Sequence, residues 1–219
     1  MKIGDIKIEA LRLMFAQLDP LISAETLSSY ENSDTIGDYL FGMTGSINRA
    51  LVDITSRKIL PEQAKDLTFD GGSSLMSAHR IDLSKVDDFY AVSRLVVESE
   101  YGYDGNAPYR MEGNTIVFIC PYPNARVTLL YYPKIKLLTG QADDNTRDLS
   151  KITDENPVVI PDEIAAVIPY FIKGELYRED EIGDAAEAMS WYEQRLASLA
   201  PYGTEKQGHV HATYSMVTL

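Results

Sequence analysis

The apolar residues of this chain recur with a helical period near both ends and with a strand-like pattern between them. Between positions 36 and 54 they follow each other at steps of three or four, which places them on one face of an α-helix: Ile36, Leu40, Met43, Ile47, Leu51 and Ile54. Residues 115–120 and 126–132 are instead runs of apolar, β-branched and aromatic residues. From residue 160 the spacing is helical again. This order predicts an α+β fold, in which N- and C-terminal helices form one bundle and an antiparallel β module is inserted between them.

Two helices are predicted before residue 61. The first ends before Pro20, because proline disfavours the helical conformation in the preceding residue. Its apolar stripe is Ile8, Leu11, Phe15 and Leu18. The second has Asp34 as its N-cap and ends at Pro61. Glycines in its first half weaken it by up to about 1 kcal/mol each relative to alanine, so we expect this half to depend on tertiary or intersubunit packing. They are Gly37, Gly42 and Gly45.

The middle region is predicted to form a small antiparallel sheet or sandwich of about four to six strands. Residues 89–98 add one strand to the two runs named above. Glu112, Gly113 and Asn114 are typical of a tight turn that leads into the strand 115–120. Residues 121–125, Pro-Tyr-Pro-Asn-Ala, have the composition of a loop that joins the strands 115–120 and 126–132 as a hairpin.

Residues 141–156 are polar and acidic, which is typical of a linker. Pro161 is then predicted at the first position of a helix, which Pro169 kinks. The buried stripe of this helix is Ile164, Ile168, Phe171 and Ile172. A second helix is predicted to turn apolar residues inward and to form an αα-hairpin with the first. These residues are Ile182, Ala185, Met189, Leu196 and Leu199.

We therefore divide the chain into four parts. Residues 1–64 supply the N-terminal helices of the bundle, and residues 65–140 supply the β module. Residues 141–200 comprise the acidic linker and the C-terminal helix pair, and residues 201–219 form an extended arm.

The net charge is −13, and residues 141–219 contain 15 acidic and 6 basic residues. Such a surface repels phosphate, which argues against ordinary nucleic-acid binding. An acidic surface would suit the lining of a channel through which DNA slides without being bound. Solubility is the simpler explanation of the charge alone. No apolar stretch approaches the roughly 20 residues of a membrane helix, and no secretory signal is visible. The single cysteine, Cys120, fits a reducing compartment.

Motifs that carry chemistry are missing from the sequence. It contains no G-x-S-x-G, no phosphate-binding G-x-x-x-x-G-K-[ST] and no G-x-G-x-x-G. His209 and His211 would share one face of a strand as half of a metal site, but no third ligand lies near them in sequence. A nucleophilic pair of Cys120 with a histidine such as His79 has nothing to position it. We expect no catalytic residue, no metal and no cofactor.

Tyrosines concentrate in the predicted β region: Tyr101, Tyr103, Tyr109, Tyr122, Tyr131 and Tyr132. They leave a rival interpretation open, a carbohydrate-binding or host-attachment module with an exposed aromatic platform. A hydrolase that uses scattered carboxylates is a second rival, although the pairs Asp87-Asp88 and Asp143-Asp144 are more typical of solvated loops.

Three stretches resemble the head-to-tail adaptor (connector, or neck) proteins of tailed bacteriophages. Residues 47–54, Ile-Asn-Arg-Ala-Leu-Val-Asp-Ile, look like the long helix that precedes their β insertion. Residues 109–133 resemble the hairpin of that insertion. The C-terminal helix pair of these adaptors is similar to residues 160–196, which include Ile-Pro-Asp-Glu at 160–163 and Trp-Tyr-Glu-Gln-Arg-Leu at 191–196.

The resemblance implies a structural virion protein of the neck, assembled in the bacterial cytoplasm. About twelve copies would form a closed ring through two different faces of each subunit. The ring would dock on the portal protein, bind the next neck or tail protein, and extend a channel that DNA passes without specific binding.

The arm is the candidate partner-binding segment, because it carries few charges and ends in residues that favour strands. We expect it to bind the portal or a neighbouring subunit, the alternative being that it packs back on its own helices. The candidate contact residues are Tyr202, His209, His211, Tyr214, Met216 and Leu219.

Overall fold

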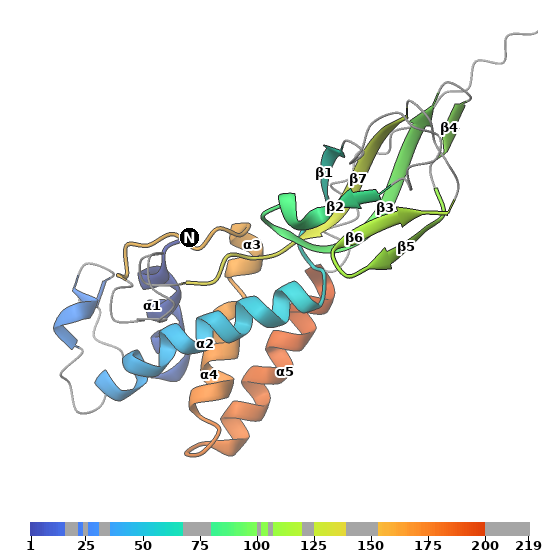
Figure 1. Ribbon diagram of the computed structural model, residues 1–219. Coiled ribbons are helices and arrows are strands. Elements are labelled where there is room, and N and C mark those ends of the chain that lie inside the picture. The colour runs from blue at the N-terminus through green and yellow to red at the C-terminus, as the bar shows by residue number, and fades with distance from the viewer. Residues whose placement is uncertain are drawn as a thin grey trace, which may run out of the picture.

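The computed structural model describes residues 1–15, 22–23, 26–30, 36–67, 80–99, 102–104, 107–119, 125–138 and 153–199. In Figure 1 the helices pack together at one end of the molecule and the strands at the other. The predicted α+β class is confirmed. The helices are α1 (Ile3–Met14), α2 (Gly37–Ser56), α3 (Asp162–Ala165), α4 (Ile168–Leu176) and α5 (Ile182–Leu199), with short 3₁₀ turns η1 (Leu27–Tyr30) and η2 (Leu83–Lys85). No helix in this part of the chain is long and apolar enough to cross a membrane.

The helices share one apolar core, with α4 packed against α1, α2 and α5. The predicted stripe of α2 is confirmed, since five of its six residues are at most 4% exposed and Ile36 packs half-buried against them. In α1, Ile8 and Leu11 are buried as expected, and Phe15 packs against the same core. The core therefore joins elements from both ends of the sequence.

The predicted ends of α2 are wrong. The helix begins at Gly37, with Ile36 as its N-cap, whereas Asp34 lies outside the described residues. It ends at Ser56, several residues before Pro61. Lys58 has a φ of 55°. This left-handed conformation ends the helix before the proline is reached.

Seven described strands form two antiparallel sheets, one more strand than the predicted range allowed. One sheet has the order β1-β7-β3-β4 and the other has the order β2-β6-β5. Their inward side chains share a second apolar core, separate from that of the helices. The strands are β1 (Gln63–Leu67), β2 (Arg80–Asp82), β3 (Phe89–Ser99), β4 (Gly102–Asp104), β5 (Tyr109–Glu112), β6 (Thr115–Phe118) and β7 (Arg126–Pro133).

The predicted hairpin between residues 115–120 and 126–132 is wrong. β6 pairs with β2 and β5, whereas β7 pairs with β1 and β3 in the other sheet. The tight turn before β6 is confirmed, because Glu112 pairs with Thr115 across two turn residues. Gly113 has a φ of 61°, which is the conformation that glycine supplies at the first position of a type II′ hairpin turn.

Two segments attach the chain to the bundle after it leaves the β module. The side-chain amide of Asn48 on α2 donates to the carbonyl of Leu138 at 3.0 Å, and its oxygen accepts from the Leu138 amide at 2.8 Å. Farther on, the first amides of α1 donate to the carbonyls of Asp154 and Asn156. These contacts satisfy backbone donors that the start of a helix leaves unpaired.

The C-terminal helices confirm the predicted hairpin with changes at three positions. Pro161 is the N-cap of α3 rather than its first residue. Pro169 lies in the first turn of the separate helix α4, where a missing N–H is tolerated, and does not kink a continuous helix. The stripe of Ile164, Ile168, Phe171 and Ile172 is buried. Ile182 was expected inside but is 72% exposed, because α5 only begins there and turns Ala185 and Tyr192 inward.

Candidate partner-binding surface

The residues proposed from the sequence as partner contacts lie outside the described residues. They are Tyr202, His209, His211, Tyr214, Met216 and Leu219. His79 and Cys120 also lie outside them. Within the described ranges, no three histidine, cysteine, aspartate or glutamate side chains are grouped to hold a metal ion. Among the described residues, the candidate partner-binding surfaces lie on the helical bundle.

The tyrosines of the β region serve contacts within the fold where the structure describes their side chains. Tyr131 is 4% exposed, and its hydroxyl lies 2.8 Å from Asp88 Oδ1 and 3.0 Å from Gln63 Oε1. Burial raises the pKa of Tyr131 to about 12, and the hydrogen bond to Asp88 adds to the effect. Tyr109 and Tyr132 are half-buried, and Lys58 lies over the Tyr132 ring. These three do not form the exposed platform that a carbohydrate-binding module needs.

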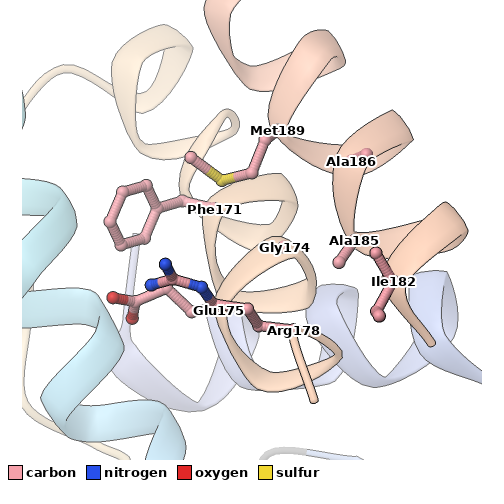
Figure 2. A pocket seen from close by; sticks show the side chains of 8 residues that line it. All are labelled: Phe171, Gly174, Glu175, Arg178, Ile182, Ala185, Ala186 and Met189. Carbon is pink, nitrogen blue, oxygen red and sulfur yellow. The ribbon is translucent and has the colours of Figure 1, made fainter. Parts of the chain in front are cut away.

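An apolar groove of about 350 Å³ runs between α4 and α5 (Figure 2). Figure 2 shows the Met189 side chain extending from α5 toward the ring of Phe171 on α4. Ile182 and two alanines continue the apolar wall along α5. The lining residues are Phe171, Gly174, Glu175, Arg178, Ile182, Ala185, Ala186 and Met189.

Gly174 permits the close approach of the two helices at the base of this groove. A Cβ atom at position 174 would lie 2.5 Å from Met189 Cγ and 3.3 Å from the carbonyl oxygen of Ala185. The first distance is shorter than carbon atoms tolerate, and the second involves backbone. A side chain at this position would therefore push α4 and α5 apart.

Two charged residues of α4 border the groove and differ in their partners. Glu175 accepts from Arg49 Nε of α2 at 2.7 and 2.9 Å, and this hydrogen bond raises the pKa of the arginine. Arg178 is exposed, and its guanidinium makes no hydrogen bond or ion pair with another residue that the structure describes. Glu175 is therefore paired within the bundle, whereas Arg178 leaves its charge available at the border of the groove.

A polar network fixes α5 to the C-terminal part of α2. The hydroxyl of Tyr192, which is fully buried, donates to Asp53 Oδ2 at 2.8 Å. Arg57 contacts the same carboxylate at 2.9 Å and binds Glu193 through two nitrogens. Burial, followed by the bond to Asp53, raises the pKa of Tyr192, and the bond to Glu193 raises that of Arg57. These shifts follow from contacts between helices, so they indicate a structural role.

Exposed apolar side chains mark two further surfaces of the bundle. On α5, Trp191 is 46% exposed and its Nε1 lies 3.4 Å from Glu187 Oε1. On α2, Phe41 is 93% exposed and Val52 is 52% exposed. Large exposed apolar residues are typical of protein contacts when several lie on one element. The turn between α4 and α5 is by contrast acidic and exposed, with Glu179, Asp180 and Glu181 in succession.

Two residues that shape this part of the bundle were not identified from the sequence. Tyr192 was not assigned to the core, although it follows Ala185 by seven residues and precedes Leu196 by four, which is a helical stripe. Arg178 lies in residues 160–196, which resemble the C-terminal helix pair of the adaptors, but the sequence did not mark it as a surface residue. Its position at the border of a groove depends on how α4 packs against α5, and no local signal reports that.

Comparison with known proteins shows the family of the chain. A comparison with curated proteins finds no significant match. The family model described as SU10 adaptor protein matches residues 1–214, which include the helical bundle, the β module and most of residues 201–219. The chain therefore belongs to the SU10 adaptor protein family.

Proposed function

We propose that this chain is a structural subunit of a tailed-phage virion and forms the neck ring that joins the portal to the tail. The observation that carries the proposal is the adaptor-family match over residues 1–214. The resemblance of the helix 47–54, the β region and the C-terminal helix pair to head-to-tail adaptors supports it. The subunit would assemble in the host cytoplasm.

The proposed role is binding rather than catalysis. The tyrosines and arginines whose pKa values are shifted, such as Tyr192, Arg57 and Tyr131, contact other parts of the fold. The groove between α4 and α5 is apolar, apart from Glu175 and Arg178 on its border. Such a surface is suited to packing against protein side chains.

The proposed partners are the portal protein, about twelve copies of the chain in one ring, and the next neck or tail protein. DNA would pass through the ring without specific binding. Acidic residues between positions 141 and 193 would line the lumen, because carboxylates repel phosphate at close approach. The exposed run Glu179–Glu181 is the leading candidate for this lining.

The experiment is to mix the purified chain with the portal protein of the same phage, measure the mass of the complex, and determine its structure by electron microscopy. We expect a ring of subunits bound to the portal. A chain that elutes at monomer size and does not comigrate with the portal contradicts the proposed function. A lumen lined mainly by lysine and arginine contradicts only the assignment of the acidic lining.

A further inference from the structure

α5 carries different surfaces on two opposite sides. At about 3.6 residues per turn, Ile182, Ala186 and Met189 lie on the side that faces the groove. Glu187 and Trp191 lie on the opposite side of the helix. Ile182 is 72% exposed and Trp191 is 46% exposed, so both sides present apolar area to solvent.

The two sides also carry complementary charges. On the groove side, Glu175 is bound by Arg49, whereas Arg178 forms no ion pair with a described residue. On the opposite side, the exposed Glu187 forms no ion pair with any residue in the described ranges, and its hydrogen bond comes from Trp191. The neighbouring Asp184 is bound by Lys173 at 3.2 Å. Each side therefore keeps one charged side chain that forms no ion pair with a described residue.

We propose that the ridge formed by Glu187 and Trp191 of one copy packs into the groove between α4 and α5 of the next copy. The inference rests on the proposed ring. Trp191 contacts Ile182 and Met189 of the neighbour, and Glu187 forms an ion pair with the neighbour's Arg178. Tryptophan and arginine are the residues most often found to dominate interface energies.

The position of both surfaces on one helix determines the kind of assembly. Each copy uses its ridge on one neighbour and its groove on the other, so the contact is heterologous and leaves a new groove and a new ridge at the ends. Such a contact repeats until the ring closes. A two-fold dimer would instead bring the same surface of both copies together.

The test reverses the two charges singly and together in the full chain. Arg178→Glu and Glu187→Arg each lower the yield of rings on the portal by about tenfold or more, because each places like charges across the contact. The double variant restores the yield to within about threefold of the wild type, since the pair is re-formed in the opposite sense. Trp191→Ala lowers the yield as either single reversal does. Rings are counted by electron microscopy and by mass.

The matched control is Val159→Ser, which removes a 77% exposed apolar side chain outside α4 and α5 and leaves the ring yield unchanged. Circular dichroism establishes that each variant is folded. The proposed pairing is overturned if the single variants are folded and form rings at the wild-type yield. It is also overturned if the double variant gives no higher ring yield than the single variants. In both cases the proposed function stands. A wild-type chain that forms no ring with its portal overturns both.

Discussion

The hydroxyl of Tyr192 donates a hydrogen bond of 2.8 Å to Asp53 Oδ2, which connects the middle of α5 to the last turns of α2. The ring of Tyr192 also packs edge-on against Phe171 of α4, with the ring centroids 5.0 Å apart. One residue thus joins three helices, close to where the chain leaves α2 for the β module. The contact therefore helps to fix the orientation of α5, and with it the direction of both of its exposed sides.

Removing the hydroxyl in Tyr192→Phe is expected to lower the free energy of unfolding by about 1.5–3 kcal/mol, the range for a hydrogen bond to a charged group. The ring remains in place, so the loss reports the hydrogen bond rather than packing. Denaturant unfolding of the full chain measures it. Tyr90→Phe, at a 40% exposed tyrosine, is the control and changes stability by less than about 0.5 kcal/mol. Equal losses in both variants would contradict the role assigned to Tyr192.

Gly174→Ala is expected to destabilise the chain by up to about 2 kcal/mol net, because overpacking costs about 1–3 kcal/mol. The new methyl group would meet Met189 and the backbone of Ala185, which outweighs the gain of about 1 kcal/mol that alanine brings to a helix. Gly45→Ala is the matched control, because its Cβ would meet only Arg49 Nη1, at 3.4 Å. Thermal unfolding should therefore show opposite shifts in the two variants. A stabilised Gly174→Ala variant would show that α4 and α5 are less closely packed than described.

Lys7→Ala is expected to cost about 3–5 kcal/mol, because it leaves a largely buried carboxylate without its partner. Lys7 Nζ lies 2.7 Å from Asp154 Oδ1, and the two side chains are only 10% and 15% exposed. Replacing both residues, in Lys7→Met with Asp154→Leu, should recover much of the loss. The control is Arg12→Ala, which breaks an exposed pair with Glu9 and changes stability by less than about 1 kcal/mol. Urea titrations compare these three variants with the wild type.

Tyr131 should make the stability of the chain depend on pH in the alkaline range. Its pKa is about 12 in the folded state, against about 10 for a tyrosine in the unfolded chain. The folded state holds the proton more tightly, so this contribution is complete below pH 10 and is lost as the pH rises toward 12. The free energy of unfolding of the wild type should fall more steeply across this window than that of Tyr131→Phe. Parallel curves for the two proteins would contradict the raised pKa.

Deleting residues 203–219 should abolish attachment to the portal while leaving the thermal stability of the free subunit nearly unchanged. A short strand-forming segment can bind through backbone hydrogen bonds to an exposed sheet edge of its partner. About twelve such segments on one ring would raise the overall affinity, because the first contact holds the others close to their sites. Calorimetry of the free subunit and co-sedimentation with the portal measure the two effects. A truncated chain that binds the portal normally, or that unfolds as a monomer, would contradict the proposed role of the arm.

Local sequence determined the main helices and the strands β3, β6 and β7, but not the short strands β1, β2, β4 and β5. The spacing of apolar residues along α2 identified its buried face, because only one side of such a helix can leave water. The Glu112–Asn114 turn was equally readable, since glycine supplies the positive φ that the turn requires. The stripe of Ile164, Ile168, Phe171 and Ile172 followed from the same helical periodicity.

Only the tertiary structure decided which elements meet. The runs 115–120 and 126–132 are compatible with pairing to each other, yet β6 and β7 lie in different sheets. The hydrophobic pattern fixes which face of a strand is buried, whereas strands pair through backbone groups that do not depend on the side chains. In the same way, periodicity placed Ile182 on an apolar side of α5 but could not show that α4 leaves this side open as a groove. A hydrophobic pattern reports which face avoids water, whereas the partner that covers the face is chosen by contacts between residues distant in sequence.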